Sequence, residues 1–192
     1  MVASVSIFEW TGTVAARTNT NLTSARYSLA DSPTPGIGNP LVIPTTGVNY
    51  SFWKHHCLNL WPTFTQIDNI RWYTDGAIGW NVGTASGFLY VGVRASGDIG
   101  CPVSGYVNAS GSTTTGVWLL SGHSYYHQVT AEISGGLINA ATYVVGSPAT
   151  VDSTAYQTSC FTKALVTQIA VATTATQGTQ TAEEVTFRYD EI

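Results

Sequence analysis

Charged residues are scarce in this sequence. Aspartate, glutamate, lysine and arginine make up only 9% of the 192 residues, far below the roughly 25% of typical soluble proteins. The seven lysines and arginines could neutralise few phosphates, so we expect no binding to nucleic acid through counterion release. A surface with so little charge also opposes close packing against neighbouring molecules only weakly. The composition therefore permits assembly into a dense structure.

Segments that would direct the chain to a membrane are also missing. The sequence contains no run of 18 apolar residues, so we expect no membrane-spanning helix and no membrane partner. The first ten residues, MVASVSIFEW, have no basic region before their short apolar stretch. They are therefore not expected to be a secretory signal, and their alternation predicts a strand instead.

The cysteines are few and widely separated. Cys57, Cys101 and Cys160 are odd in number, and without a secretory signal they argue against a disulfide framework. Free cysteines are frequently buried, so we interpret all three as small apolar residues of the interior.

Motifs for catalysis and metal binding are absent as well. The sequence lacks GxSxG, HExxH, GxGxxG and a phosphate-binding glycine loop, and its carboxylates are scattered. His55 and Cys57 would share one face of a strand while His56 faces away. His123 and His127 have a helical spacing, but their segment has the character of a loop or strand. We therefore predict a protein that is not an enzyme and binds no metal or cofactor.

Threonine dominates the polar residues and is more frequent than the four charged types together. It is β-branched and suits a pleated surface, whereas strong helix formers are scarce. Turn-forming clusters separate the apolar segments, including the proline-rich stretch 32–40 and the polar stretch 18–24. The segments predicted as strands are 3–10, 41–44, 49–61, 67–74, 88–94, 117–120, 128–133, 141–145, 165–171 and 185–192.

These features predict an all-β fold with little or no helix. No strand–helix–strand alternation and no linker divide the chain, so residues 1–192 are expected to form a single domain. Many short strands separated by turns are typical of an antiparallel β-sandwich, of jelly-roll or immunoglobulin-like type. Segment 49–61 is apolar at both odd and even positions, which predicts a strand covered on both faces.

The six tryptophans fall into two groups. Four of them lie in strand-like segments and are predicted to belong to the core: Trp10, Trp53, Trp72 and Trp118. Trp61 and Trp80 lie nearer to turns. These two are candidate interface residues or glycan contacts, because exposed aromatic side chains anchor protein interfaces and stack on sugars.

The final segment, VTFRYDEI, alternates clearly. Val185, Phe187 and Tyr189 would face one way, with Thr186, Arg188 and Asp190 facing the other. We predict an integral strand, paired along at least one edge, and a candidate strand for pairing between subunits.

Two stretches resemble a known group of proteins. TQIDNIRWYTDG (65–76) and VTQIAVATTATQGTQTAEEVTFRYDEI (166–192) are similar to virion structural proteins of tailed bacteriophages, of the capsid decoration (cement) kind. The resemblance implies a homodimer or homotrimer made in the host cytoplasm and located on the capsid surface of the virion. Its partners would be the major capsid protein and copies of itself, and its function would be to stabilise the head.

Two alternatives use the same fold. One is a carbohydrate- or receptor-binding tail component whose loop aromatics contact a glycan. The other is a subunit of a cellular filament or surface layer, for which the expected lack of a secretory signal is unfavourable.

Overall fold

The computed structural model describes residues 3–13, 16–52, 54–83, 87–93 and 138–192. These residues form two antiparallel sheets and one short 3-10 helix, η1 (Ala140–Thr142). The predicted all-β, sandwich-like fold is confirmed. None of the described helical residues forms a segment long and apolar enough to cross a membrane.

The larger sheet has eight strands, with the path β2-β1-β4-β10-β6-β7. β3 also pairs with β10, and β9 pairs with β4. The strands are β1 (Ser4–Thr13), β2 (Ala16–Asn21), β3 (Val48–Tyr50), β4 (Lys54–Trp61), β6 (Phe88–Val93), β7 (Ile138–Asn139), β9 (Cys160–Phe161) and β10 (Leu165–Ala172).

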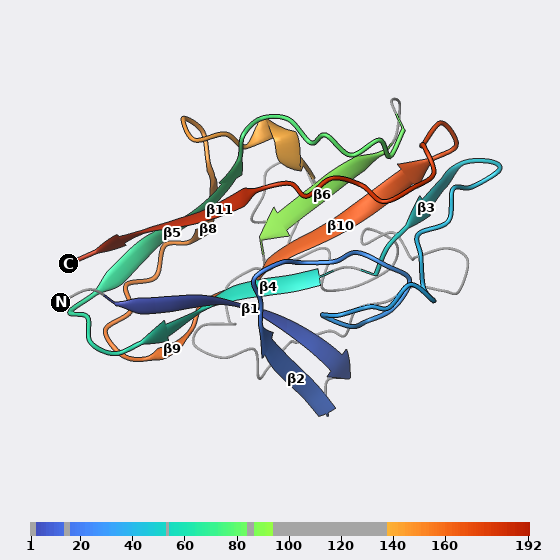
Figure 1. Cartoon of the computed structure of the whole chain (residues 1–192). Helices are drawn as coiled ribbons and strands as arrows, with labels where there is room; N and C mark the ends of the chain where they lie inside the picture. Colours follow the sequence, from blue (N-terminus) through green and yellow to red (C-terminus); the bar gives the residue numbers. More distant parts are fainter. Residues whose placement is uncertain (1–2, 14–15, 53, 84–86, 94–137) are drawn as a thin grey trace.

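The smaller sheet has three strands in the order β11-β5-β8. They are β5 (Ile67–Thr74), β8 (Ala149–Asp152) and β11 (Val185–Glu191). Figure 1 shows β11 alongside β5. The Ala3 backbone N–H donates to Glu191 Oε1 at 2.7 Å, which ties the first described residue to β11.

One hydrophobic cluster joins the two sheets. Leu58 and Leu60 of β4 belong to it together with Ile70 and Trp72 of β5, and all four are almost completely buried. The apolar area removed from water between the two layers is the main stabilising contribution to such a fold. The predicted core position of Trp72 is confirmed, whereas Trp53 and Trp118 lie outside the described residues.

The strand predicted at 49–61 is divided into β3 and β4. β4 is buried on both faces along all but its last residue, as predicted. A second cluster covers the face opposite the main core, where Trp10 Nε1 donates to Cys57 Sγ at 3.1 Å. The Phe161 ring lies edge-on to the rings of Phe8 and Trp10, with centroid distances of 5.4 and 5.3 Å. This packing confirms the core position of Trp10 and the interior position of Cys57.

β10 is buried at every position, although its sequence alternates like a strand with one exposed face. Gln168 explains the difference. It is completely buried, and its Nε2 donates to the backbone oxygen of Ser51 at 2.8 Å, so the polar side chain is satisfied inside the protein.

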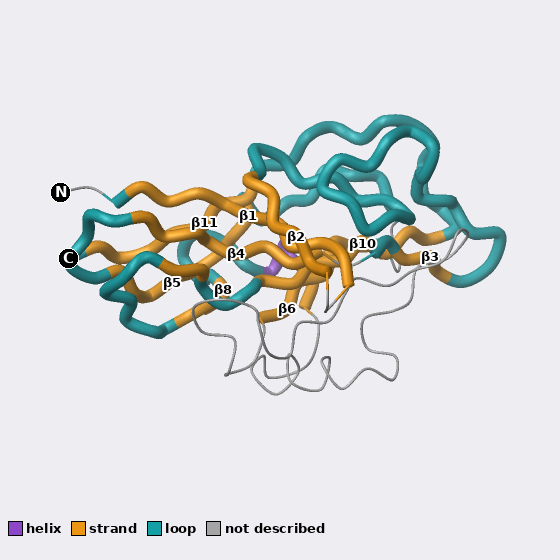
Figure 2. Tube along the Cα trace, turned by 90° about the horizontal axis from the view of Figure 1, so that it is seen from below, coloured by secondary structure: helices purple, strands orange, loops and turns teal. Residues whose placement is uncertain are grey.

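Residues 22–47 connect β2 to β3 without forming a strand, so the strand predicted at 41–44 is wrong. Pro40 and Pro44 flank this segment, and a proline has no N–H to donate to a sheet. The connection packs onto the larger sheet, where the Tyr27 hydroxyl and Thr167 Oγ1 are 2.7 Å apart. In Figure 2 loops gather on one side of β2, β10 and β3.

The strand predicted at 141–145 is also wrong. Asn139 caps η1, because its side chain accepts from the Ala141 N–H at 3.1 Å. Tyr143 N–H then donates to the Ala140 carbonyl at 3.0 Å, which closes a turn in place of a strand. The strands predicted at 117–120 and 128–133 lie outside the described residues.

Candidate subunit interface

A buried charge cluster lies on the core-facing side of the larger sheet. In the antiparallel pairing of β1 with β4, Glu9 lies directly opposite His56, and Lys54 shares their face two residues away. Glu9 Oε1 is 2.7 Å from Lys54 Nζ, and Glu9 Oε2 is 3.2 Å from His56 Nε2. All three residues are buried. Because an unpaired buried charge is costly, Glu9 and Lys54 depend on each other.

The cluster also fastens the 22–47 connection to the sheet. Lys54 Nζ donates to the Ser32 carbonyl at 2.6 Å. Asp31 Oδ2 accepts from the Gly12 N–H at 2.8 Å. Burial raises the pKa of the Asp31 carboxyl, against the lowering effects of the Gly12 hydrogen bond and the Lys54 charge. These contacts hold a long connection, without strands of its own, in one position.

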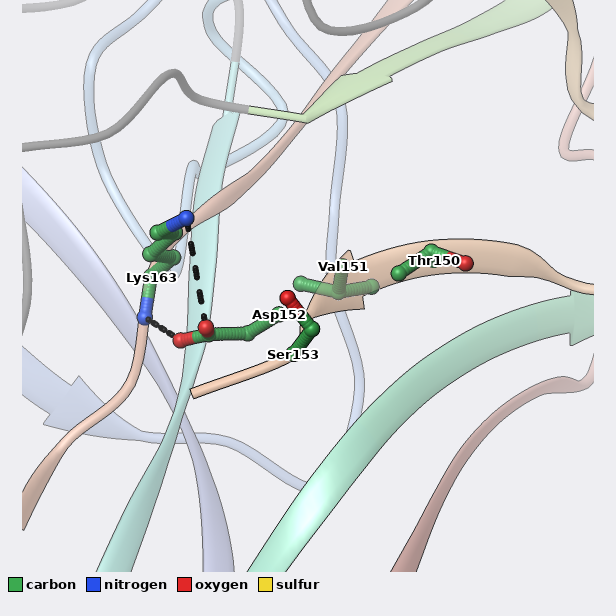
Figure 3. A pocket seen from close by; sticks show the side chains of 5 residues that line it. All are labelled: Thr150, Val151, Asp152, Ser153 and Lys163. Carbon is green, nitrogen blue, oxygen red and sulfur yellow. Dashed lines mark hydrogen bonds and ion pairs between the residues drawn. The ribbon is translucent and has the colours of Figure 1, made fainter. Parts of the chain in front are cut away.

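A second polar cluster surrounds Asp152 at the end of β8. Figure 3 shows Asp152 beside Lys163, with dashed lines joining the two residues. The carboxylate accepts from the Tyr156 hydroxyl, from the Lys163 N–H at 3.0 Å and from the Thr154 N–H at 2.9 Å. Lys163 Nζ lies 4.0 Å from Asp152 Oδ1. The carboxylate is therefore engaged by donors from the chain between β8 and β10.

A small cavity adjoins this cluster. It has a volume of about 220 Å³ and is lined by Thr150, Val151, Asp152, Ser153 and Lys163. Burial raises the pKa of the Tyr156 hydroxyl, and the Asp152 carboxylate raises it further. The contacts of Asp152 organise the chain between β8 and β10.

The two candidate aromatic residues occupy different environments. Trp61 ends β4 and its side chain is 54% exposed. Trp80 is half-buried, donates its Nε1 hydrogen to the Thr181 carbonyl at 2.7 Å, and packs edge-on against Tyr27. Trp61 therefore keeps a surface for a partner or glycan, whereas much of Trp80 serves to pack the segment after β5 against the segment before β11.

β11 lies at the margin of the smaller sheet. It pairs with β5 along one edge, and among the described residues no strand pairs with its other edge. Phe187 and Tyr189 are partly buried against the core, and Val185 is 38% exposed. The predicted integral strand is confirmed, and the use of Val185, Phe187 and Tyr189 in subunit pairing stays a prediction.

The outer face of this sheet carries like charges opposite each other. Arg188 of β11 lies opposite Arg71 of β5, and Asp190 lies opposite Asp68. Between these pairs β5 has a bulge that contains Asn69, with a φ of 50°. Asn69 Nδ2 donates to Asp190 Oδ2 at 3.0 Å. No ion pair joins either arginine to a carboxylate in the part of the chain that the structure describes.

The histidines and cysteines do not converge on a common point. Within the described ranges, no group of three or more histidine, cysteine or acidic side chains is placed to hold a metal ion. Cys57 is buried and Cys160 is half-buried, and they form no disulfide with each other. Cys101, His123 and His127 lie outside the described residues.

Sequence reasoning missed the charge cluster of Glu9, Lys54 and His56. The available signal was a charged residue at an inward position of each of two apolar strands, because such residues are rarely buried unless paired. Their partnership depends on the register between β1 and β4.

No known protein family, curated protein or solved structure matches this chain. A function must therefore be inferred from its own residues.

Proposed function

We propose that this protein is a non-enzymatic structural component of a virion, a decoration (cement) protein. It binds the outer surface of the capsid as a homo-oligomer and stabilises the head, with the major capsid protein and copies of itself as partners. The observation that carries the proposal is a contrast within the molecule. Its buried charges fasten loops to the sheets, while one edge of β11 in the smaller sheet has no pairing strand within the described ranges.

The fastening of loops to the sheets supports a role in assembly. Lys54 holds the Ser32 carbonyl, and Asp152 holds the backbone of Lys163. A surface that is ordered before binding loses less conformational entropy when it joins a neighbour. Many symmetric contacts of this kind together raise the resistance of a capsid shell to rupture, even when each contact is weak.

The surface composition supports the same role. The net charge is −4 with only 9% charged residues, so neighbouring copies repel one another weakly. Some large apolar side chains remain exposed, including Ile37, Val42 and Trp61. Apolar and aromatic side chains of this kind form the centres of protein interfaces. The resemblance of segments 65–76 and 166–192 to decoration proteins agrees with this interpretation.

The test compares virions assembled with and without this protein. We expect virions that lack it to release their genome at a lower temperature, and addition of the purified protein to restore the higher temperature. Electron microscopy should then show extra density spread evenly over the head. Equal release temperatures together with an undecorated head would contradict the proposal.

One observation favours a second candidate, a glycan- or receptor-binding tail component. Trp61 is more than half exposed, and an exposed indole can stack on a sugar ring. In that case density would appear only at the tail, and the change Trp61→Ala would abolish binding to a glycan array. Binding by the Trp61→Ala variant equal to that of the original protein would remove this candidate.

A further inference from the structure

We propose that β11 pairs antiparallel with β11 of a second copy of this chain, about a two-fold axis that passes through Tyr189. The two three-stranded sheets would then form one continuous six-stranded sheet. This inference rests on the self-association part of the proposed function, and not on the capsid. Figure 1 shows β11 extending along β5 for its whole length, and among the described residues no strand occupies the other side of β11.

The backbone directions of β11 limit how a partner can pair. Ile192 and Gln66 exchange both backbone hydrogen bonds, at 3.0 and 3.2 Å. Along an antiparallel strand such pairs recur at every second residue, so even-numbered residues of β11 direct their N–H and C=O groups towards β5. The bulge does not change this alternation, because its extra residue belongs to β5. Phe187, Tyr189 and Glu191 therefore direct their backbone groups towards the open edge.

In an antiparallel pair, two opposed residues either both direct their backbone groups towards the partner strand or both direct them away. A symmetric pairing of two β11 strands therefore needs its two-fold axis to pass through a residue that lies opposite its own copy. A centre at Arg188 would place two guanidinium groups opposite each other. A centre at Phe187 would place Asp190 opposite Glu184 of the other copy, and a centre at Asp190 would oppose two carboxylates. Directly opposed like charges destabilise a sheet. The centre at Tyr189 instead places Arg188 opposite Asp190 of the other copy, and symmetry makes this pair twice.

In the same register, the second copy supplies an opposite charge to each like-charged pair of the first copy. Arg188 lies opposite Arg71, and Asp190 lies opposite Asp68, on the outer face. In the pairing centred at Tyr189, each arginine of β11 gains a carboxylate from the second copy and each Asp190 gains a guanidinium. Charged side chains on an edge strand ordinarily discourage pairing. Here their signs permit pairing with an identical strand in one register and oppose it in the adjacent ones.

Two further contacts of this register are favourable. On the inner face the two Tyr189 side chains lie next to each other, and aromatic pairs across strands stabilise a sheet. On the outer face Ile192, which is 71% exposed, would lie against Thr186 of the other copy. The pairing therefore covers an exposed apolar residue next to the open edge.

Disulfide trapping tests the register directly. In a chain with Cys101 and Cys160 changed to serine, Arg188→Cys and Asp190→Cys are introduced into separate proteins, and Cys57 stays because it is buried. We expect a cross-linked dimer when the two proteins are mixed under oxidising conditions, because opposed residues on antiparallel strands meet the distance that a disulfide needs. Efficient cross-linking of either protein alone would place the centre at Arg188 or Asp190 and overturn the register.

A matched control separates pairing from random collision. Thr150 is exposed on the outer face of β8, at the far margin of the same sheet. The Thr150→Cys protein mixed with the Asp190→Cys protein should give little cross-linked dimer. Thermal unfolding of each variant confirms that the fold is retained. Equal yields in the control and the test mixtures would contradict the inference.

Charge reversal provides a second measurement. Arg188→Asp and Asp190→Arg should each weaken self-association about tenfold, because each creates two repulsive pairs. The double variant should recover most of the loss, since both pairs then attract with opposite sign. Analytical ultracentrifugation over a range of protein concentrations measures these changes.

The outcomes distinguish this inference from the proposed function. If the original protein oligomerises but the charge variants change nothing, the β11 pairing is wrong while self-association stands. If the original protein is monomeric and no mixture cross-links, both the pairing and the homo-oligomer are wrong. Capsid stabilisation is measured independently, by the temperature of genome release.

Discussion

At the scale of single residues, the buried charged side chains are ones on which the stability of the fold depends. Glu9, Lys54 and His56 are each at least nine-tenths buried, yet Glu9 uses its two carboxylate oxygens for two different partners. A buried ion pair adds little stability over an apolar replacement, but the loss of one partner is costly because it leaves a charge unpaired.

Lys54 is therefore predicted to be essential to the fold. The change Lys54→Met should lower the free energy of unfolding by about 3–5 kcal/mol, because it leaves the Glu9 carboxylate and the Ser32 carbonyl without this donor. Urea unfolding measures the loss. The double variant Lys54→Met with Glu9→Gln is the matched control and should be more stable than Lys54→Met alone. Equal stability of Lys54→Met and the original protein would show that Lys54 does not compensate Glu9.

Cys160 provides a prediction about pH. Burial, followed by the Asp152 carboxylate, raises the pKa of the Cys160 thiol to about 11. Since the folded-state pKa is raised, the stability linked to this thiol is complete below the ordinary thiol pKa and is lost as the pH rises through about 11. At pH 8 the thiolate fraction is on the order of 100-fold smaller than in an ordinary thiol.

Alkylation by iodoacetamide should therefore be correspondingly slow at Cys160 and should accelerate about tenfold for each pH unit above 8. Mass spectrometry of the digested protein identifies the modified cysteine. The urea-unfolded chain is the control, in which the same thiol should react at the ordinary rate. Equal rates at pH 8 in the folded and unfolded chains would contradict the raised pKa.

At the scale of elements, strands with a strong local pattern were predictable. The predictions at 67–74, 165–171 and 185–192 agree with β5, β10 and β11 to within a residue. Each of these segments alternates or is rich in β-branched and aromatic residues, so local preference and final structure agree.

The strands that sequence reasoning missed depend on their partners. β2 is polar except for Ala16 and exists because it pairs with β1, with Asn19 opposite Trp10. β8 and β9 are too short for a period to be visible. The reverse error occurred at 141–145, where the cap from Asn139 and the turn after it prevailed over a good local β preference. Strand pairing over long sequence separation is not encoded in any short window.

The candidate site was likewise predictable only where it depends on local sequence, and not where it depends on strand pairing. The alternation of Val185, Phe187 and Tyr189 was visible in the sequence. The like-charge pair of Arg188 with Arg71 was not, because it depends on the register between strands more than 100 residues apart. Register is therefore the information that the structure adds, both for the buried cluster of Glu9 and for the open edge of β11.

At the scale of the whole molecule, two sheets with one shared core support a loop that is fixed at its base and exposed at its tip. Asp31 and Ser32 are held by Gly12 and Lys54, and the Leu29 N–H donates to the Asn39 carbonyl at 3.1 Å. Three prolines in segment 32–40 further restrict its backbone. This segment presents the fully exposed side chain of Ile37.

A single exposed apolar residue is ordinary on a protein surface, but a loop fastened at its base makes Ile37 a suitable anchor for the proposed contact with the capsid. Burial of an isoleucine side chain contributes about 1.5–3 kcal/mol. The change Ile37→Ser should therefore weaken binding to undecorated capsids about 10- to 100-fold, while the temperature of unfolding stays the same because Ile37 makes no core contact. Co-sedimentation with capsids measures the affinity, and Thr46→Ser, at another exposed position of the same connection, is the matched control. Capsid binding that is equally strong in the Ile37→Ser and Thr46→Ser variants would exclude this loop from the contact, and the interface would then have to involve a different surface, such as that around Trp61.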